Sequence, residues 1–120
     1  MHDNSANTLK WYVNGTEQNT NTSVNVPSNT GTFYLGTNSD ANDKYFNGQI
    51  DEVRIWNDIR TASEIADNKD DELVGNESGL VAYYKMSDGT GTTLTDNSSN
   101  SYNGTPVSYT HLTLPTNREV

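Results

Sequence analysis

Residues 49–65 constrain the fold most, because the spacing of the apolar side chains changes partway along this segment. Val53 and Ile55 alternate with polar neighbours, which is the pattern of a half-buried β-strand. Ile50 is out of phase with this alternation, so we expect a β-bulge near residues 51–52 that re-aims the two carboxylates there. The segment therefore predicts a strand with acidic side chains near its start.

A short helix is expected directly after this strand. Thr61 and Glu64 have the spacing of a capping box, in which the Thr hydroxyl and the Glu carboxylate each satisfy a free amide. Ile65 is the only large apolar residue before Leu73, so the helix near residues 61–68 can pack only through a narrow stripe. This is the one helix that the sequence predicts.

The N-terminal part of the chain predicts a β-hairpin. Apolar residues alternate up to Val13, and Asn14-Gly15 follows at once with the strongest short hairpin-turn signal. Because Trp11 lies on the same face as Val13, we expect its indole in the core, with Tyr12 on the opposite face.

Further short strands make the prediction mostly β. Val24 and Val26 are apolar at alternate positions, Phe33 and Leu35 repeat this pattern, and residues 80–84 form a strongly apolar run. Turn-forming Gly, Asn, Asp and Ser separate these runs. The sequence thus predicts an all-β chain of short strands joined by many turns.

Composition limits the partners and the core of such a fold. Sixteen acidic residues against seven basic ones leave a net charge of −9, which argues against nucleic acid as a partner. No apolar run approaches the ~20 residues that cross a bilayer, so we expect no membrane span. The sequence contains no cysteine, which removes disulfides and thiolate sites. Only 31% of the residues are hydrophobic, which predicts a thin core.

Four segments resemble the motifs of a known family, in the same order and with similar spacing. They are LKWYVNG at residues 9–15, FYLG at 33–36, GQIDEVRIWN at 48–57 and RTASEI at 60–65. Together they resemble the C-terminal signature of the laminin-G-like, concanavalin A-like lectin/glucanase jelly-roll family. The resemblance implies an antiparallel two-sheet jelly-roll sandwich. Motifs of the family's N-terminal half are missing, so the sandwich is expected to be incomplete.

Three regions follow from this resemblance. Residues 1–74 correspond to the C-terminal half of a laminin-G-like jelly roll. Residues 75–106 resemble a junction strand and loop that open a following module in bacterial surface proteins. Residues 107–120 resemble a translated sequencing adapter, and we interpret them as a non-native tail. A native strand with alternating apolar residues is the alternative for this tail.

The sequence does not predict an enzyme. His2 and His111 are the only histidines, and neither stands near the nucleophile-elbow motif of a Ser-His-Asp hydrolase. Glycosidases need two carboxyl groups that flank the sugar, and the resemblance implies a Glu-x-Asp-x-Glu spacing for enzymes of this fold. That spacing does not occur here, because Asp51 and Glu52 are adjacent and would point to opposite faces of a regular strand.

Calcium (Ca2+) is the cofactor that the acidic loops favour, since hard cations bind several oxygen ligands at once. Asp40 and Asp43 lie together on a polar loop, where solvated side chains are the alternative. The resemblance implies Asp51 as the best metal ligand, with Asp88 and Asp96 as weaker partners. The alternative for Asp51 is a structural role, in which it caps the preceding turn or pairs with the nearby arginine.

Aromatic side chains are the candidates for binding an organic ligand. Tyr12 and Tyr34 alternate with the apolar positions of their segments, so we expect them on an exposed ligand-binding face. Trp56 ends an apolar strand and is expected in the core.

The resemblance, the missing catalytic groups and the acidic, Cys-free composition together predict a function. We expect a non-catalytic adhesion or carbohydrate-binding module of a larger extracellular or cell-surface bacterial protein, with calcium as a candidate stabilising ion. Its partners would be glycans or extracellular proteins, together with neighbouring domains of the same polypeptide. Two alternatives stay open: a purely structural spacer domain, and an accessory domain of a secreted polysaccharide-degrading enzyme.

Overall fold

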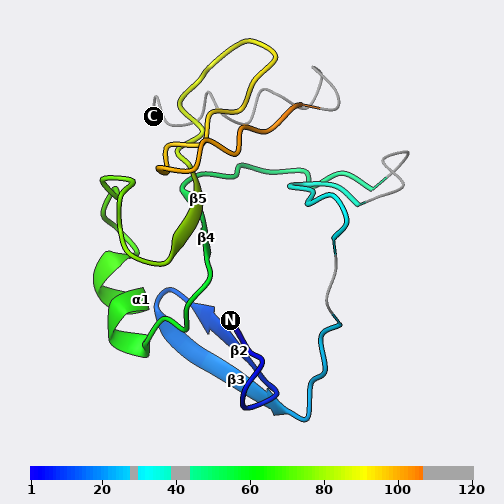
Figure 1. The fold of residues 1–120 in the computed structure, drawn as a ribbon, viewed down its shortest axis with the longest axis vertical. Coiled ribbons are helices and arrows are strands. Elements are labelled where there is room, and N and C mark those ends of the chain that lie inside the picture. Colours follow the sequence, from blue (N-terminus) through cyan, green and yellow to red (C-terminus); the bar gives the residue numbers. More distant parts are fainter. Residues whose placement is uncertain (28–29, 39–43, 107–120) are drawn as a thin grey trace.

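The computed structural model describes residues 1–27, 30–38 and 44–106, and it shows two antiparallel β-sheets and one short helix (Figure 1). The first sheet has the strand order β1-β2-β3, and the second pairs β4 with β5. The elements are β1 (His2–Asp3), β2 (Thr8–Val13), β3 (Thr16–Thr22), β4 (Val53–Trp56), α1 (Ala62–Asn68) and β5 (Leu80–Tyr84). The predicted all-β, two-sheet antiparallel arrangement with one short helix is confirmed.

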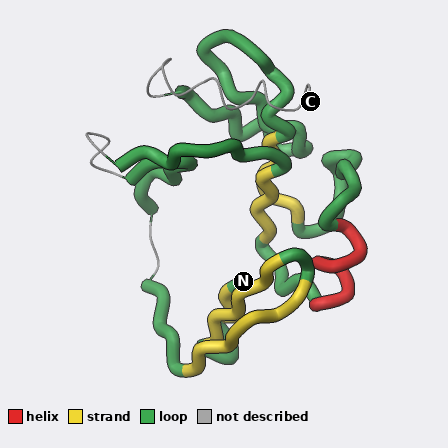
Figure 2. Tube along the Cα trace, turned by 180° about the vertical axis from the view of Figure 1, so that it is seen from behind, coloured by secondary structure: helices red, strands yellow, loops and turns green. Residues whose placement is uncertain are grey.

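The β2–β3 hairpin forms where the Asn-Gly signal predicts it. Asn14 and Gly15 have φ angles of 51° and 78°, the left-handed values that a two-residue turn between twisted strands requires. Gly15 also lies against α1, because a Cβ atom added to it would be only 3.0 Å from Ala66 Cα. The tip of the hairpin therefore packs on the helix, as Figure 2 shows from behind.

Two predicted short strands are wrong. Residues 24–26 and 33–35 lie outside the strands of the structure, and Phe33 is 65% exposed. The two-residue turn sets the register of the hairpin, so the polar residues directly after the turn pair with β2. The two valines fall beyond the end of β3. Hydrogen bonding in the ladder, rather than apolar alternation, decides which residues form the strand here.

The change of face before β4 comes from one left-handed residue. Glu52 has a φ of 51° and precedes β4, while the irregular register of this sheet lies further along, inside β4. With the chain turned at Glu52, Ile50 packs in the same apolar cluster as Val53 and Ile55. The predicted β-bulge at residues 51–52 is therefore wrong, although the change of face that motivated it is real.

Helix α1 begins with the capping box that the sequence predicts. Thr61 Oγ1 accepts a hydrogen bond from Glu64 N at 3.2 Å, and Glu64 Oε2 accepts one from Thr61 N at 2.8 Å. This bond from the Thr61 main chain is the main cause that lowers the pKa of Glu64. In the described residues, no helix has the length and apolar character that crossing a bilayer requires.

The buried core lies on the second sheet, around β5. Tyr83 is completely buried and packs with Leu73 and Leu80. A second buried group consists of Ala82, Tyr84 and Met86. Most of the core of the described chain therefore comes from β5 and the residues that flank it, with β4 packed alongside.

The two tryptophans have different surroundings. Trp56 is partly buried and packs against the cluster around Tyr83, in agreement with the prediction. Trp11 is 54% exposed, so the prediction that it lies in the core is wrong. Val13 on the same strand is 57% exposed, which shows that this face of β2 is left uncovered in the described structure.

A loop covers the edge of β5 that β4 leaves unpaired. Asp96 Oδ1 accepts a hydrogen bond from Tyr83 N at 2.8 Å, and Asn100 Nδ2 donates to Val81 O at 2.8 Å. We name residues 96–100 the edge loop. Its side chains take the place of a neighbouring strand, so the exposed main-chain groups of this edge are satisfied without a further strand.

The second sheet also joins two of the predicted regions. Strand β4 belongs to residues 1–74 and β5 to residues 75–106, and the two strands pair with each other. The domain boundary between them stays a prediction. The predicted non-native tail, residues 107–120, lies outside the described residues.

Candidate functional site

One face of the β2–β3 hairpin combines an exposed indole with two neutral amides. Trp11 lies directly opposite Asn19 in the ladder, and Leu9 lies opposite Asn21. Opposed residues of an antiparallel pair point to the same side, so these four residues share one surface, which we name the Trp11 face. Asn19 Nδ2 donates to Asn21 Oδ1 at 3.4 Å, which places the two amides side by side.

The opposite face of the hairpin carries a charged cluster. Glu17 Oε2 accepts hydrogen bonds from Lys10 Nζ at 3.0 Å and from Tyr12 Oη at 3.1 Å. Glu17 Oε1 accepts a further one from Thr20 Oγ1 at 2.5 Å. The bonds from Thr20 and Lys10 hold the pKa of Glu17 below its usual value. Tyr12 is a predicted ligand-binding residue. Its side chain is half-buried, and its hydroxyl donates to Glu17 within the chain.

Tyr34, the other predicted ligand-binding residue, lies apart from Tyr12. It belongs to residues 30–38, which run away from the hairpin in both views of the chain (Figures 1 and 2). Tyr34 is half-buried and stands outside the strands. The structure does not bring the two tyrosines onto one surface, and a ligand-binding role for either stays a prediction.

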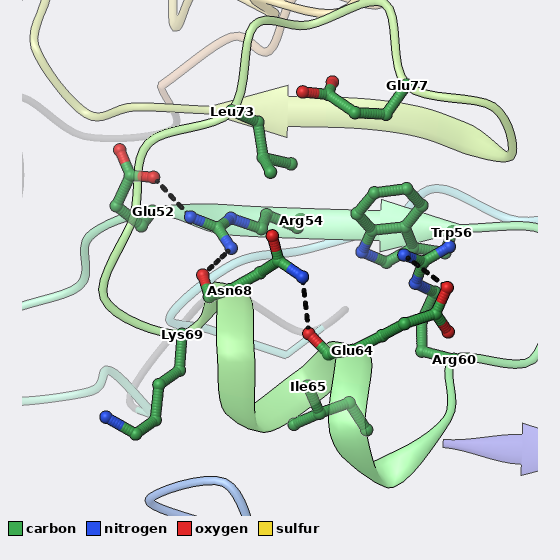
Figure 3. A pocket seen from close by; sticks show the side chains of 10 residues that line it. All are labelled: Glu52, Arg54, Trp56, Arg60, Glu64, Ile65, Asn68, Lys69, Leu73 and Glu77. Atoms are coloured by element: carbon green, nitrogen blue, oxygen red, sulfur yellow. Dashed lines mark hydrogen bonds and ion pairs between the residues drawn. The ribbon is translucent and has the colours of Figure 1, made fainter.

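A pocket of about 280 Å³ lies between β4, α1 and the chain that follows the helix (Figure 3). Its lining residues are Glu52, Arg54, Trp56, Arg60, Glu64, Ile65, Asn68, Lys69, Leu73 and Glu77. Three of these side chains are cationic and three are acidic, so their charges balance. The pocket thus has an aromatic wall and several charged groups. What it can bind depends on whether these charged groups are already bonded to other groups of the chain.

Arg54 ties β4 to the end of α1. Its Nη1 donates to Asn68 O at 2.7 Å, and its Nη2 donates to Glu52 Oε2 at 3.0 Å. The same Glu52 oxygen accepts a hydrogen bond from Tyr83 Oη at 2.6 Å. Burial, together with this bond to Glu52, raises the pKa of Tyr83 to about 12. Arg54, Glu52 and Tyr83 therefore form one bonded unit beside the pocket.

The remaining charged groups of the pocket are also used within the chain. The Arg60 guanidinium lies 4.1 Å from the centroid of the Trp56 ring and forms an ion pair with Glu64 at 3.1 Å. Glu77 accepts hydrogen bonds from two main-chain N–H groups at 2.7 and 2.8 Å. These groups hold α1 and the following loop on β4, and the indole of Trp56 is covered by a cation. The Trp11 face is the more accessible of the two aromatic sites.

Comparison with known proteins identifies the family. The model of the family described as the concanavalin A-like lectin/glucanases superfamily matches residues 1–66, which is more than half of the chain. The chain belongs to this superfamily. No curated protein and no solved structure gives a significant match. The matched residues include the first sheet, β4 and most of α1, so the resemblance expected from the motifs is confirmed.

The three aspartates expected to bind calcium in this member of the superfamily each bond to different groups of the chain. Asp51 is exposed, and its Oδ1 accepts a hydrogen bond from Glu52 N at 2.9 Å. Arg54, which was considered as a partner of Asp51, pairs with Glu52. Asp88 is exposed and accepts hydrogen bonds from the main-chain N–H and the hydroxyl of Thr95.

Asp96 is buried and serves as an anchor for main-chain amides. Its oxygens accept hydrogen bonds from Tyr83 N, Ser98 N and Ser98 Oγ at 2.8 Å each, and from Tyr102 N at 2.7 Å. Burial acts to raise the pKa of Asp96, but these bonds outweigh burial and hold the pKa below its usual value. A cation at Asp96 would have to displace donors that already satisfy the carboxylate.

The expected calcium ligands do not assemble into one site. Within residues 1–27, 30–38 and 44–106, no group of three or more His, Cys, Asp or Glu side chains could hold a metal ion. The other acidic pair considered for calcium, Asp40 and Asp43, lies outside the described residues. Calcium binding by this superfamily member therefore stays a prediction.

The alternation of apolar residues within β2 does not reveal the Trp11 face, although the sequence of the partner strand carries one signal for it. Strand β3 has the sequence TEQNTNT, so it offers Trp11 no apolar partner across the ladder. On a pair of antiparallel strands, a large ring is covered mainly by the side chains opposite it on the partner strand. The composition of the partner strand, rather than the alternation within β2, therefore carries the information on exposure.

Proposed function

We propose that this chain is a non-catalytic carbohydrate-binding or adhesion module that takes glycans on the Trp11 face. The observation that carries the proposal is the 54% exposed indole of Trp11, directly opposite Asn19 and next to Asn21. Membership of the concanavalin A-like lectin/glucanases superfamily supports the same class of function. The setting would be extracellular, within a larger polypeptide.

The chemistry of the Trp11 face suits a sugar ring. An exposed indole offers a flat apolar surface with one N–H donor, against which the C–H face of a pyranose can lie. Each amide side chain supplies both donors and an acceptor, which match the hydroxyl groups at the rim of the sugar. The four residues of this face carry no charge, although the chain has a net charge of −9. We therefore expect neutral sugars to bind better than acidic ones.

A glycan array tests this proposal, read with the full chain and with two variants. Trp11→Ala should abolish binding, because it removes the apolar platform. Phe33→Ala is the matched control, since Phe33 is an exposed aromatic residue at 65% that lies outside the Trp11 face. Binding that survives Trp11→Ala, or a blank array with the wild-type chain, would reject the Trp11 face as the site.

A calcium arm of the same experiment separates the ion from the sugar. The array is read with calcium and with a chelator, and the melting temperature is recorded in both conditions. A ligand that binds only the folded state must raise the melting temperature, so calcium that changes neither binding nor melting would exclude a role for the ion.

A structural spacer is the second candidate, and the pocket beside α1 favours it. The charged groups that line this pocket are paired within the chain, as expected for groups that hold a fold together. A spacer without a ligand predicts a blank array and a melting temperature that neither sugars nor calcium change.

A further inference from the structure

The chain contains three Asn-Gly dipeptides, at residues 14–15, 47–48 and 103–104, and the structure holds them in different ways. Such a dipeptide can convert spontaneously. The Gly main-chain nitrogen attacks the Asn side-chain Cγ, a C–N bond forms, and the amide nitrogen leaves as ammonia. Water then opens the cyclic imide to aspartate or isoaspartate. Hydrogen bonds that fix the attacking nitrogen or the side-chain amide oppose the first step.

Asn103-Gly104 is held at both reacting groups. Asn103 Oδ1 accepts a hydrogen bond from Asp96 N at 2.9 Å, which fixes the side-chain amide. Gly104 N donates to Leu94 O at 2.8 Å, and Leu94 N donates back to Gly104 O at 2.9 Å. The nitrogen that would attack is therefore part of a paired bridge, and cyclisation requires both sets of bonds to open.

Asn14-Gly15 is held by its turn. Both residues have left-handed φ angles, and the flanking residues Val13 and Thr16 pair with each other in the ladder. Gly15 is packed so closely on α1 that an added Cβ would lie 3.0 Å from Ala66 Cα. The peptide plane between Asn14 and Gly15 cannot rotate without opening the hairpin tip.

Asn47-Gly48 has none of these restraints. Asn47 is exposed and lies on the irregular segment before β4. Neither its side chain nor Gly48 N has a hydrogen bond to another described residue. The atoms nearest to Gly48 are the far end of the Phe46 ring, 2.8 Å from an added Cβ, and Phe46 is 53% exposed, so this neighbour can move aside, unlike the helix backbone beside Gly15.

We propose that Asn47 is a site of spontaneous deamidation, selected over the other two Asn-Gly dipeptides by its lack of restraining contacts. Each conversion adds one negative charge to a chain whose net charge is already −9. The isoaspartate product also inserts a methylene into the main chain shortly before Ile50, which packs in the core cluster around Ala82 and Tyr84. The product is thus a modified form with altered charge and altered packing next to β4.

The test is an ageing experiment on the full chain at mildly alkaline pH, followed by trypsin digestion and mass spectrometry. Trypsin cuts after Lys44 and Arg54, and the released peptide has Asn47 as its only asparagine. We expect the native chain to convert Asn47 at least about tenfold faster than Asn103, because the hydrogen bonds on Asn103 Oδ1 and on Gly104 N must open first. In concentrated urea the rates at all three sites should converge, since the folded contacts are gone.

Two results would overturn the proposal. One is an equal native rate at Asn47 and Asn103. The other is a native Asn47 that stays intact over the time in which the urea-unfolded chain converts. An Asn47→Gln variant gives an independent reading: its longer side chain cyclises slowly, so the acidic form that accumulates on ion exchange should disappear. Persistence of that form in the variant would place the modification elsewhere.

Discussion

Trp11 and Trp56 both stand on short antiparallel strands, yet one indole faces solvent and the other packs on the core. The first sheet contains a hairpin whose second strand, β3, is entirely polar, so β3 supplies nothing to bury the ring of Trp11. In the second sheet β5 is apolar, Leu73 and Trp56 pack with its buried residues, and the edge loop bonds to its free edge. Burial of an aromatic residue thus depends on its neighbours across the sheet more than on the pattern of its own strand.

The largest effect should come from the centre of the second sheet. Tyr83→Ala removes the completely buried ring and its hydrogen bonds to Glu52 and Leu73. We expect a loss of ~3–5 kcal/mol in the free energy of unfolding, typical of a large-to-small change in a core. Thermal unfolding followed by circular dichroism measures it. A loss below that of a surface change would mean that the second sheet is not the stable part of the chain.

The next effect concerns the anchor of the edge loop. Asp96→Asn removes the negative charge that accepts hydrogen bonds from Tyr83, Ser98 and Tyr102, with an expected loss of about 2 kcal/mol at neutral pH. Chemical denaturation measures it. Asp88→Asn is the control, because Asp88 is exposed and bonds only within its own loop.

The same carboxylate predicts a dependence on pH. The folded pKa of Asp96 lies below its ordinary value of 3.8, so the folded state favours the charged form. Its contribution to stability is complete above 3.8 and is lost as the pH falls through 3.8 toward the folded pKa. As the pH is lowered through this range, the free energy of unfolding should fall more steeply for the wild-type chain than for Asp96→Asn. Parallel curves for the two proteins would contradict this assignment.

A smaller effect is expected where the first sheet meets the helix. Gly15→Ala places a Cβ against Ala66 at a φ of 78°, and we expect a loss of about 1–2 kcal/mol. Gly89→Ala is a matched control, since Gly89 has a φ of 72° and open space around it. The difference between their melting temperatures isolates the contact between hairpin and helix. Equal shifts would show that the hairpin tip is free of α1 in solution.

The smallest effect on stability should come from Trp11→Ala. An exposed side chain on the surface contributes within about 0.5 kcal/mol, so the melting temperature should hardly change. A large destabilisation in this variant would contradict the difference between the two tryptophans. It would mean that Trp11 is covered by part of the protein, and it would also remove the basis of the proposed glycan site.

Local signals in the sequence predicted local structure well. The capping box of Thr61 and Glu64 and the turn at Asn14-Gly15 formed as expected, because each depends on contacts within a few residues. The strand at residues 80–84 was also predicted, since its apolar run is long enough to be buried on both sides. The family motifs identified the superfamily for the same reason: they record short strand and helix patterns.

Features that depend on distant residues could not be predicted in this way. The role of Asp96 is set by donors on Tyr83 and Tyr102, which no spacing rule connects to it. The Glu52 carboxylate accepts a hydrogen bond from Tyr83, which is distant in the sequence. The exposure of Trp11 depended on the composition of a second strand, which the pattern of β2 alone does not contain.

The edge loop affects how well the protein resists aggregation at high concentration. Strand β5 is a continuous apolar run with the sequence LVAYY, which makes it a strong template for pairing with the same strand of another molecule. The hydrogen bonds from residues 96–100 occupy the groups that such pairing would use. Aggregation through β5 must therefore wait for this loop to detach, so weakening its attachment should shorten the lag before fibrils appear, even where the rest of the fold persists.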